Sequence, residues 1–276
     1  MYHPIPHEWL FSASLVKVKF TDAQGDIKTG QGTGFWILTN EKTFVFVTNR
    51  HVVDLAYGNP KYSGYGYKIC ELEITSFDSK GMPKVCLVKE PVIRIHQKDS
   101  VDIALIADPS RTVTEAMQHV ARAVPTNVLA DEQFINTSLE WGAQVTFSSY
   151  QPWRDKETEL PIVRTGIVSS NPRATHTISG IDRKSVLLLE ALSFSGSSGS
   201  PVYANARGIQ TSGPITGGNF REAKVVGIIA GHIRNSGEGD TEFVGNLHTG
   251  LSYCHRSDLL LRMLSCDSSE PTNTLE

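Results

Sequence analysis

The stretch FWILTNEKTFVFVT, residues 35–48, carries the clearest fold signal in this chain. It contains two apolar runs of strand length, Phe35–Leu38 and Phe44–Thr48. The residues between them, Thr-Asn-Glu-Lys, are typical of a turn. The pattern therefore predicts a hairpin of two adjacent strands.

The rest of the chain repeats this pattern of short apolar runs between turn-forming residues. Two segments have helical spacing instead: Thr114–Val124, which ends before Pro125, and Ser257–Leu264, which begins on a serine suited to cap a helix. Many strands, few helices and no regular alternation of the two favour an all-β barrel or sandwich. The other expected strands are Leu15–Phe20, Ile69–Thr75, Val85–Val88, Val92–Ile95, Ile103–Ala107, Gln144–Phe147, Ile162–Val168, Val186–Leu192 and Val225–Ala230.

The composition excludes several classes of protein. The 276 residues suffice for one large or two small domains, and 39% hydrophobic with 20% charged residues excludes a disordered chain. The net charge of -3 gives no basic excess for nucleic acid. No apolar run approaches the roughly 18 residues of a membrane span. Met1–Leu10 contains no Lys or Arg and is a poor match to a signal peptide, so we expect a cytoplasmic protein.

The four cysteines, Cys70, Cys86, Cys254 and Cys266, have no C-x-x-C spacing, which argues against a structural zinc site. Cys70 and Cys86 flank a predicted hairpin turn at Asp78–Gly81, and the sequence leaves open whether they pair. The chain also lacks an H-E-x-x-H motif. We therefore expect neither a metal nor another cofactor.

A glycine- and serine-rich segment, Ser195-Gly-Ser-Ser-Gly-Ser-Pro201, lies between two strong strand signals. One interpretation is a flexible loop. The other is a tight turn that presents Ser198, because Gly196 and Gly199 allow the backbone to approach a substrate closely. In that case the N–H groups of Gly196 and Ser198 could face a developing oxyanion. This segment alone does not decide between the two.

A serine nucleophile needs a base, usually histidine, and a third group that orients the base. Among nine histidines, His51 is distinctive because it follows a predicted strand through a short turn, where a rigid scaffold places functional groups. Asp102 precedes the apolar run Ile103–Ala107, where a carboxylate without a partner would be costly. Asp99 and Asp108 are the alternatives on flanking loops.

Five segments, taken together and in this order, resemble motifs of the trypsin-like serine proteases. The form Gly-x-Ser-Gly-Ser-Pro is similar to the serine motif of bacterial trypsin-like peptidase domains. The matching segments lie within residues 32–231 and are Gly32-Thr-Gly-Phe-Trp-Ile, Thr48-Asn-Arg-His51-Val-Val, Asp102-Ile-Ala-Leu, Gly196-Ser-Ser198-Gly-Ser-Pro and Val226-Gly-Ile-Ile-Ala-Gly.

This resemblance implies two antiparallel six-stranded β-barrels of the chymotrypsin type and a short C-terminal helix. Residues 1–110 would form the barrel with His51 and Asp102, and residues 141–264 the barrel with Ser198 and the terminal helix. Residues 111–140 would link the barrels and include a short helix, and residues 265–276 would be a disordered tail. The implied activity is that of an endopeptidase that acts on protein or peptide substrates through a Ser–His–Asp triad and an acyl-enzyme intermediate. Its oxyanion hole would consist of the backbone of Gly196 and Ser198, and neither nucleic acid nor a membrane would be a partner.

Two departures from the family concern activation and specificity. Ser197 stands where digestive members have an aspartate that pairs with a newly cut N-terminus, and the Ile-Val-Gly-Gly start is absent, so we expect no such activation step. Leu192 aligns with the acidic pocket residue of trypsin, which argues against cleavage after Lys or Arg. The other residues expected to line the pocket are Ser193, Ile229, Ala230, Gly231 and Thr249.

The pocket residues predict a preference for an uncharged, small or apolar side chain. His232 and His248 are close in sequence and would suit an acidic or amide side chain. However, Ile229 occupies the position at which glutamyl endopeptidases have a histidine, and surface histidines are the simpler interpretation.

Three alternatives remain. A serine hydrolase with a nucleophile elbow would need a helix that Pro201 interrupts, and a doubly wound fold needs many more helices. A metal protein has little support beyond His3 and His7 near the N-terminus. The third alternative is a latent or inactive protein of the protease fold, which would need an activating protein partner to assemble its site.

Overall fold

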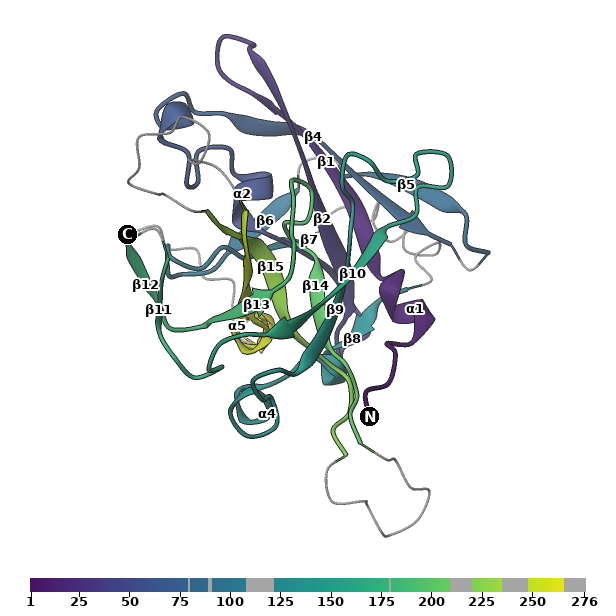
Figure 1. Ribbon diagram of the computed structural model, residues 1–276. Helices are drawn as coiled ribbons and strands as arrows, with labels where there is room; N and C mark the ends of the chain where they lie inside the picture. Colours follow the sequence, from purple (N-terminus) through teal and green to yellow (C-terminus); the bar gives the residue numbers. More distant parts are fainter. Residues whose placement is uncertain are drawn as a thin grey trace.

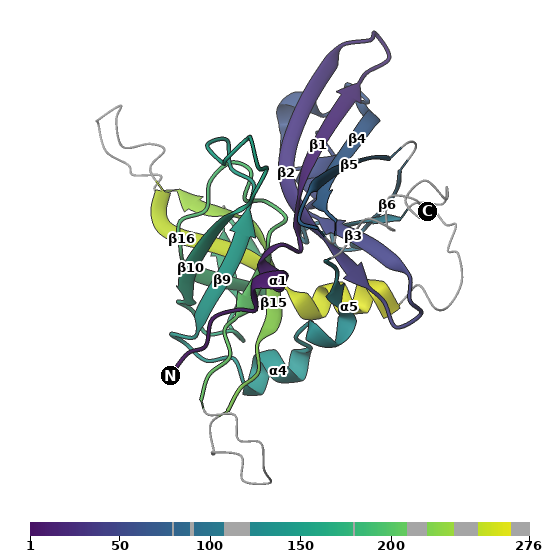
Figure 2. The same cartoon turned by 90° about the vertical axis from the view of Figure 1, so that its right-hand side faces the viewer.

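The computed structural model describes residues 1–78, 80–88, 91–107, 122–178, 180–208, 220–234 and 248–265. The chain folds into an N-terminal sheet and a C-terminal barrel that lie side by side, as Figure 2 shows in purple to blue and in green to yellow. The all-β class and the chymotrypsin-like architecture expected from the sequence are confirmed. Of the two expected six-stranded barrels, the C-terminal one is closed, whereas the N-terminal half is an eight-stranded half-barrel sheet. No helix among the residues described has the length and hydropathy needed to cross a membrane.

The N-terminal half is an eight-stranded sheet that curls into a half-barrel (Figure 1). The expected hairpin of residues 35–48 is confirmed, with Phe35 opposite Val47 and Leu38 opposite Phe44. The strand order is β5-β4-β1-β2-β3-β7-β6, and β8 pairs in parallel with β2. The strands are β1 (Ala13–Thr21), β2 (Ile27–Leu38), β3 (Phe44–Thr48), β4 (Lys68–Phe77), β5 (Pro83–Val88), β6 (Val92–Ile95), β7 (Ala104–Ala107) and β8 (Val124–Pro125).

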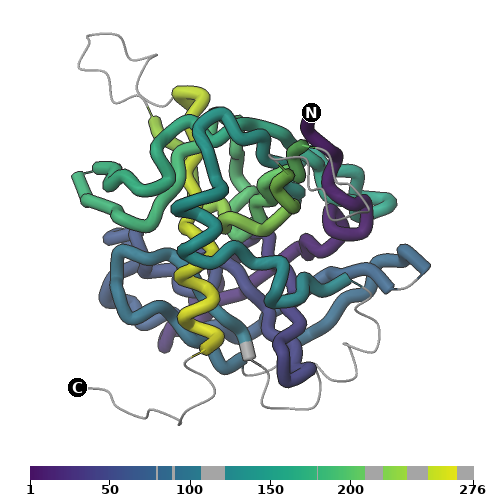
Figure 3. The backbone as a smooth tube through the Cα atoms, turned by 90° about the horizontal axis from the view of Figure 1, so that it is seen from below, coloured from purple at the N-terminus to yellow at the C-terminus, as the bar shows by residue number. Residues whose placement is uncertain are grey.

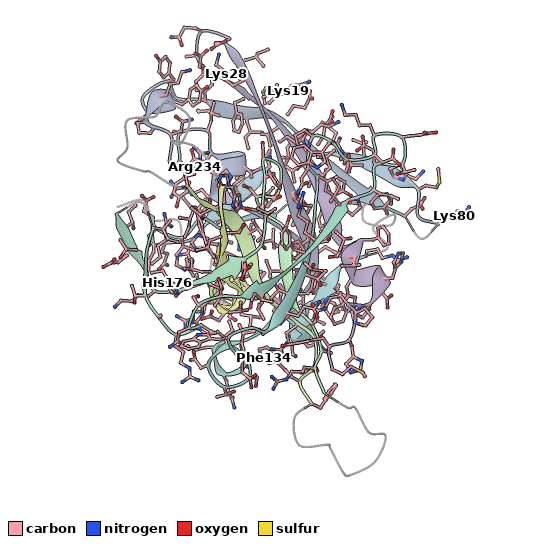
Figure 4. All side chains as sticks on the ribbon, viewed as in Figure 1. Lys19, Lys28, Lys80, Phe134, His176 and Arg234 are labelled. Atoms are coloured by element: carbon pink, nitrogen blue, oxygen red, sulfur yellow. The ribbon has the colours of Figure 1, made fainter. Side chains whose placement is uncertain are left out.

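The outer end of this sheet carries ion pairs on its surface. Figure 4 labels Lys19 and Lys28 there. Lys19 pairs with Glu71 at 2.5 Å and Lys28 with Asp26 at 2.7 Å, and all four side chains are solvent-accessible. Exposed ion pairs of this kind contribute little to the stability of the fold.

The C-terminal half is a closed antiparallel barrel in the order β10-β13-β16-β15-β14-β9. A small hairpin of β11 (His176–Ile178) and β12 (Ile181–Arg183) lies outside the barrel. The barrel strands are β9 (Gln144–Ser149), β10 (Ile162–Val168), β13 (Val186–Glu190), β14 (Pro201–Ala204), β15 (Lys224–Arg234) and β16 (His248–Arg256).

The helices are short. The expected C-terminal helix is confirmed as α5 (Ser257–Ser265), which begins on the predicted serine. Of the expected helix Thr114–Val124, residues 114–121 lie outside the described part, and its last residue was placed wrongly because Val124 forms β8. The tail from residue 266 also lies outside it. The remaining helices are α1 (His7–Leu10), α2 (Arg50–Val53) and α4 (Glu132–Thr137), with the 3-10 turns η1 (Pro60–Tyr62) and η2 (Thr126–Val128).

One hydrophobic core joins the two halves. Helix α5, yellow in Figure 3, runs from the barrel across to the N-terminal sheet. Its Leu259 and Leu260 pack with Phe35 of β2, Val47 of β3 and Ile228 of β15. Because these residues are almost fully buried, the shared core fixes the barrel against the sheet.

The open question about Cys70 and Cys86 is answered by the register of the β4–β5 hairpin. Cys86 lies opposite Ile74, four residues along β4 from Cys70. Cys86 is buried, whereas Cys70 is exposed with its Sγ 3.4 Å from the Lys19 carbonyl oxygen. The two cysteines therefore form no disulfide.

Candidate active site

His51 is held at the end of a strand by contacts with Asp102. Strand β3 ends at Thr48, and Asn49 leads into α2, which contains His51 and packs against β2. The His51 Nδ1 and an Asp102 Oδ2 are 2.6 Å apart, and the His51 backbone N–H donates to the other carboxylate oxygen at 2.9 Å. The buried Asn49 side chain donates to the Asp102 carbonyl at 2.6 Å. Asp102 is thus fixed from both its side chain and its backbone.

The Asp102 carboxyl is ionised at neutral pH in this setting. Burial alone favours the neutral acid, but the hydrogen bond and the charge of His51 outweigh burial and hold the pKa of Asp102 below its ordinary value. An ionised carboxylate only accepts hydrogen bonds, so His51 Nδ1 carries the proton of the neutral ring. The His51 Nε2 is then the atom available as a base.

A second histidine, His255 on β16, lies behind Asp102 and was not expected from the sequence. Its Nε2 accepts the Asp102 backbone N–H at 3.1 Å, and its ring contacts Tyr253 edge-on. The ring is completely buried, which lowers the pKa of His255 to about 4. His255 is therefore neutral, with its proton on Nδ1, a buried atom for which the described residues supply no hydrogen-bond partner.

The segment around Ser198 forms tight turns, as the second of the two interpretations predicts. The Ser197 N–H donates to the Phe194 carbonyl at 2.8 Å, and the Ser200 N–H to the Ser197 carbonyl at 3.1 Å. Gly196 and Gly199 have φ angles of 91° and 90°. A Cβ at Gly199 would lie 1.8 Å from a carbonyl oxygen, so no other residue fits there.

Ser198 itself is partly exposed between buried neighbours. Within the described residues, the backbone N–H groups of Gly196 and Ser198 donate to no protein acceptor. The Ser198 carbonyl accepts the Thr33 N–H at 2.8 Å.

The serine segment and the histidine helix meet at Gly32 of β2. A Cβ built there would lie 2.8 Å from the side chain of Val52, the residue after His51, and 3.3 Å from the Ser198 carbonyl oxygen. The structure thus joins His51 to Asp102 directly and brings Ser198 to the same junction. Within the described residues, no hydrogen bond links the Ser198 hydroxyl to His51.

Ser197 is the centre of a polar chain that was not expected from the sequence. Its Oγ accepts the Phe194 N–H and a Gln151 Nε2–H, each at 3.2 Å. Gln151 is fully buried, and its Oε1 accepts from Arg164 Nη2 at 3.0 Å. Because arginine can only donate, it fixes the orientation of the Gln151 amide. The Arg164 guanidinium also lies over the Phe194 ring, 4.8 Å from its centre.

The expected pocket residues have different environments. Leu192 is exposed, whereas Ser193 is buried and bonds with Ser252 Oγ. Ala230 is buried, Gly231 lies against the Tyr253 ring, and Thr249 donates to the Ile233 carbonyl at 2.9 Å.

Ile229 contributes its backbone to the serine segment, while its side chain packs in the barrel core. Its carbonyl accepts the Gly199 N–H at 2.8 Å, and its N–H donates to the Ser200 carbonyl at 2.9 Å. These two bonds fix the serine segment along β15.

His232 and His248 stack beside this region, with ring centres 4.5 Å apart. Burial lowers the pKa of both rings. His248 Nδ1 accepts the Gly250 N–H at 2.9 Å, so Nε2 carries the proton of the neutral ring. Nε2 lies 3.3 Å from Ser193 N, which places this ring in the wall next to Ser193. Among the residues that the structure describes, no group of three His, Cys, Asp or Glu side chains is placed to hold a metal ion.

The family model described as trypsin-like peptidase domain matches residues 32–208, a range that includes His51, Asp102 and Ser198. No curated protein matches the chain. Among solved structures, the crystal structure of Deg5 is similar, with 16% sequence identity, a TM-score of 0.49 and coverage of 92% of this chain and 88% of that chain.

Proposed function

The chain belongs to the trypsin-like peptidase family, and from this we propose that it is a serine endopeptidase with His51, Asp102 and Ser198 as its triad. The observation that carries the proposal is the 2.6 Å contact of His51 Nδ1 with the buried Asp102 carboxylate. That contact leaves His51 Nε2 as the ring nitrogen that can act as a base.

The proposed chemistry assigns a role to each group, and these roles are those known for the family. His51 Nε2 takes the Ser198 hydroxyl proton while Oγ attacks the peptide carbonyl carbon. The N–H groups of Gly196 and Ser198 stabilise the resulting oxyanion. His51 then gives its proton to the leaving amine, and water hydrolyses the acyl-enzyme by the same steps. Asp102 holds the imidazole and stabilises its protonated form.

The specificity that we propose is for an uncharged, small or apolar residue before the cleaved bond. Leu192 supplies no negative charge at the position that binds Lys or Arg in trypsin, and the pKa values lowered by burial keep His232 and His248 neutral at pH 7. Digestion of a peptide library, read by mass spectrometry, tests this. Cleavage mainly after Glu or after Arg would contradict it.

The pairing of Ser197 with Gln151 supports a site that needs no newly cut N-terminus. We propose that the protease is active without cleavage to a new N-terminus, in the cytoplasm of a bacterium. The test compares peptide hydrolysis by the wild type with that by Ser198→Ala and His51→Ala. Turnover close to that of the wild type in either variant would contradict the triad.

A latent protease-fold protein that needs an activating partner is the second candidate. It is favoured by one observation, the lack of a hydrogen bond between His51 and the Ser198 hydroxyl in the described structure. A folded wild type without turnover that gains activity on addition of a cell extract would favour this candidate.

A further inference from the structure

Thr33 occupies an unusual place on β2, the strand that faces the barrel in Figure 2. β3 pairs with β2 only from Phe35 onward, so at Thr33 one edge of β2 has no strand beside it. Thr33 pairs with Leu15 of β1 on the opposite edge. The residue is fully buried, and buried backbone groups require partners. Other segments therefore supply the partners of Thr33.

The first of these segments is the serine segment. The Thr33 N–H donates to the Ser198 carbonyl at 2.8 Å, and the Thr33 hydroxyl donates to the Gly196 carbonyl at 2.6 Å. The hydroxyl also accepts the Tyr150 N–H at 2.9 Å. Since a backbone N–H can only donate, the single hydroxyl hydrogen is committed to Gly196. Thr33 thus holds the carbonyls of both residues whose N–H groups form the proposed oxyanion hole.

The second segment is the one that leads to the histidine. The Thr33 carbonyl accepts the Thr48 hydroxyl at 2.7 Å, three residues before His51. Gly199 packs directly on this pair, because a Cβ there would lie 1.8 Å from the Thr33 oxygen and 2.6 Å from Thr48 Oγ1. Thr33 therefore contacts both the serine side and the histidine side of the site.

We propose that Thr33 is a positioning residue that aligns the serine segment of the barrel with His51 of the N-terminal sheet. This inference rests on the proposed peptidase function. Thr33 contacts no substrate in this account. Without its hydroxyl, the buried Gly196 carbonyl and Tyr150 N–H would lose their partner, and the segment would shift to satisfy them. Displacement of reacting groups by about 1 Å can reduce a rate about 100-fold.

The test replaces Thr33 with valine, which has the same shape and backbone but no hydroxyl, and with serine, which keeps the hydroxyl. We expect Thr33→Val to lower kcat on a peptide substrate by about 10- to 100-fold with KM little changed. Thr33→Ser should restore most of kcat. A kcat for Thr33→Val within twofold of the wild type would overturn the proposal.

Thr146→Val is the matched control for a merely structural role. Thr146 is buried, and its hydroxyl donates to Asn205 at 2.9 Å, within the barrel. This variant loses a comparable hydrogen bond and should keep the wild-type kcat. An equal fall in kcat for Thr146→Val and Thr33→Val would show that general destabilisation, and not positioning, causes the loss.

Two further measurements keep the outcomes separate. If Thr33→Val does not fold, Thr48→Val removes only the bond on the histidine side, and an unchanged kcat in that variant would overturn the proposal.

The rate of Ser198 labelling by a fluorophosphonate is measured for every variant. If the wild type shows neither labelling nor turnover, the peptidase function is overturned and this inference with it. If the wild type is labelled and Thr33→Val is labelled at the same rate, only the inference is overturned.

Discussion

Acidification should destabilise this protein through His255, the buried histidine behind Asp102. Burial lowers the His255 pKa from 6.5 to about 4. Between these values the unfolded chain binds a proton that the folded chain does not, so the free energy of unfolding rises with pH through this window. The difference of about 2.5 pKa units corresponds to about 3 kcal/mol. This stability is complete above pH 6.5 and is lost as the pH falls from 6.5 to 4.

Urea unfolding followed by tryptophan fluorescence from pH 4.0 to 7.5 measures this effect. The comparison is with His255→Gln, which keeps an acceptor for the Asp102 N–H but does not titrate. Both proteins carry Ser198→Ala to prevent self-cleavage. The lowered pKa values of His96, His232 and His248 affect both proteins alike and cancel in the difference.

The contribution of Asp102 falls in a different pH range. The pKa of Asp102 in the folded protein lies below the ordinary value of 3.8, so this carboxylate stabilises the fold fully above pH 3.8. That stability is lost only when the pH falls below 3.8 and through the pKa of the folded state. The pH dependence of the wild type should therefore exceed that of His255→Gln by about 3 kcal/mol between pH 6.5 and 4. Parallel curves of unfolding free energy against pH for the two proteins would show that His255 does not cause the loss of stability.

Three more predictions concern the candidate site. Gly199→Ala should fail to fold or lose most of its thermal stability, measured by circular dichroism. Gly25 has a similar φ of 83° and no atom within 4 Å of a built Cβ, so Gly25→Ala should lose only about 1–2 kcal/mol of stability. Equal losses in the two variants would contradict the packing argument. Gln151→Leu removes a hydrogen bond to Ser197 and should lower kcat about tenfold with little change in KM, and a selective rise in KM would contradict this role. Asp102→Asn should lower kcat about 10⁴-fold, the loss that the family aspartate shows, and a loss below tenfold in a steady-state assay would exclude Asp102 as the triad acid.

Local hydrophobic pattern was enough to predict most strands, because most runs of apolar residues form strands with at least one buried face. The pattern failed where burial comes from tertiary position. β16 (His248–Arg256) reads as a mixture of polar, aromatic and glycine residues, yet it is buried at its C-terminal end because it pairs with both β13 and β15. β2 extends back to Ile27 through polar and glycine residues because all of β1, from Ala13 to Thr21, pairs with its segment Ile27–Phe35.

The candidate site divides in the same way. His51, Asp102 and Ser198 stand in short motifs, and the sequence predicted them together. The residues that support them act over long sequence distances, such as the 153 positions between Asp102 and His255. Thr33 stands in the motif Gly32-Thr-Gly-Phe-Trp-Ile, but the motif gives no sign of its contacts, which form where the sheet packs against the barrel. Gln151 carries no local pattern that distinguishes it from a structural residue, and its contacts with Ser197 and Arg164 form within the C-terminal half.

Labelling with a fluorophosphonate probe shows whether the triad is assembled. The protein is treated with the probe, and the adduct is measured by intact mass and located by peptide mapping. We expect one adduct, on Ser198, that is absent in Ser198→Ala and blocked by His51→Ala. No adduct on the folded wild type, or an adduct on another serine, would contradict an assembled Ser198–His51–Asp102 triad.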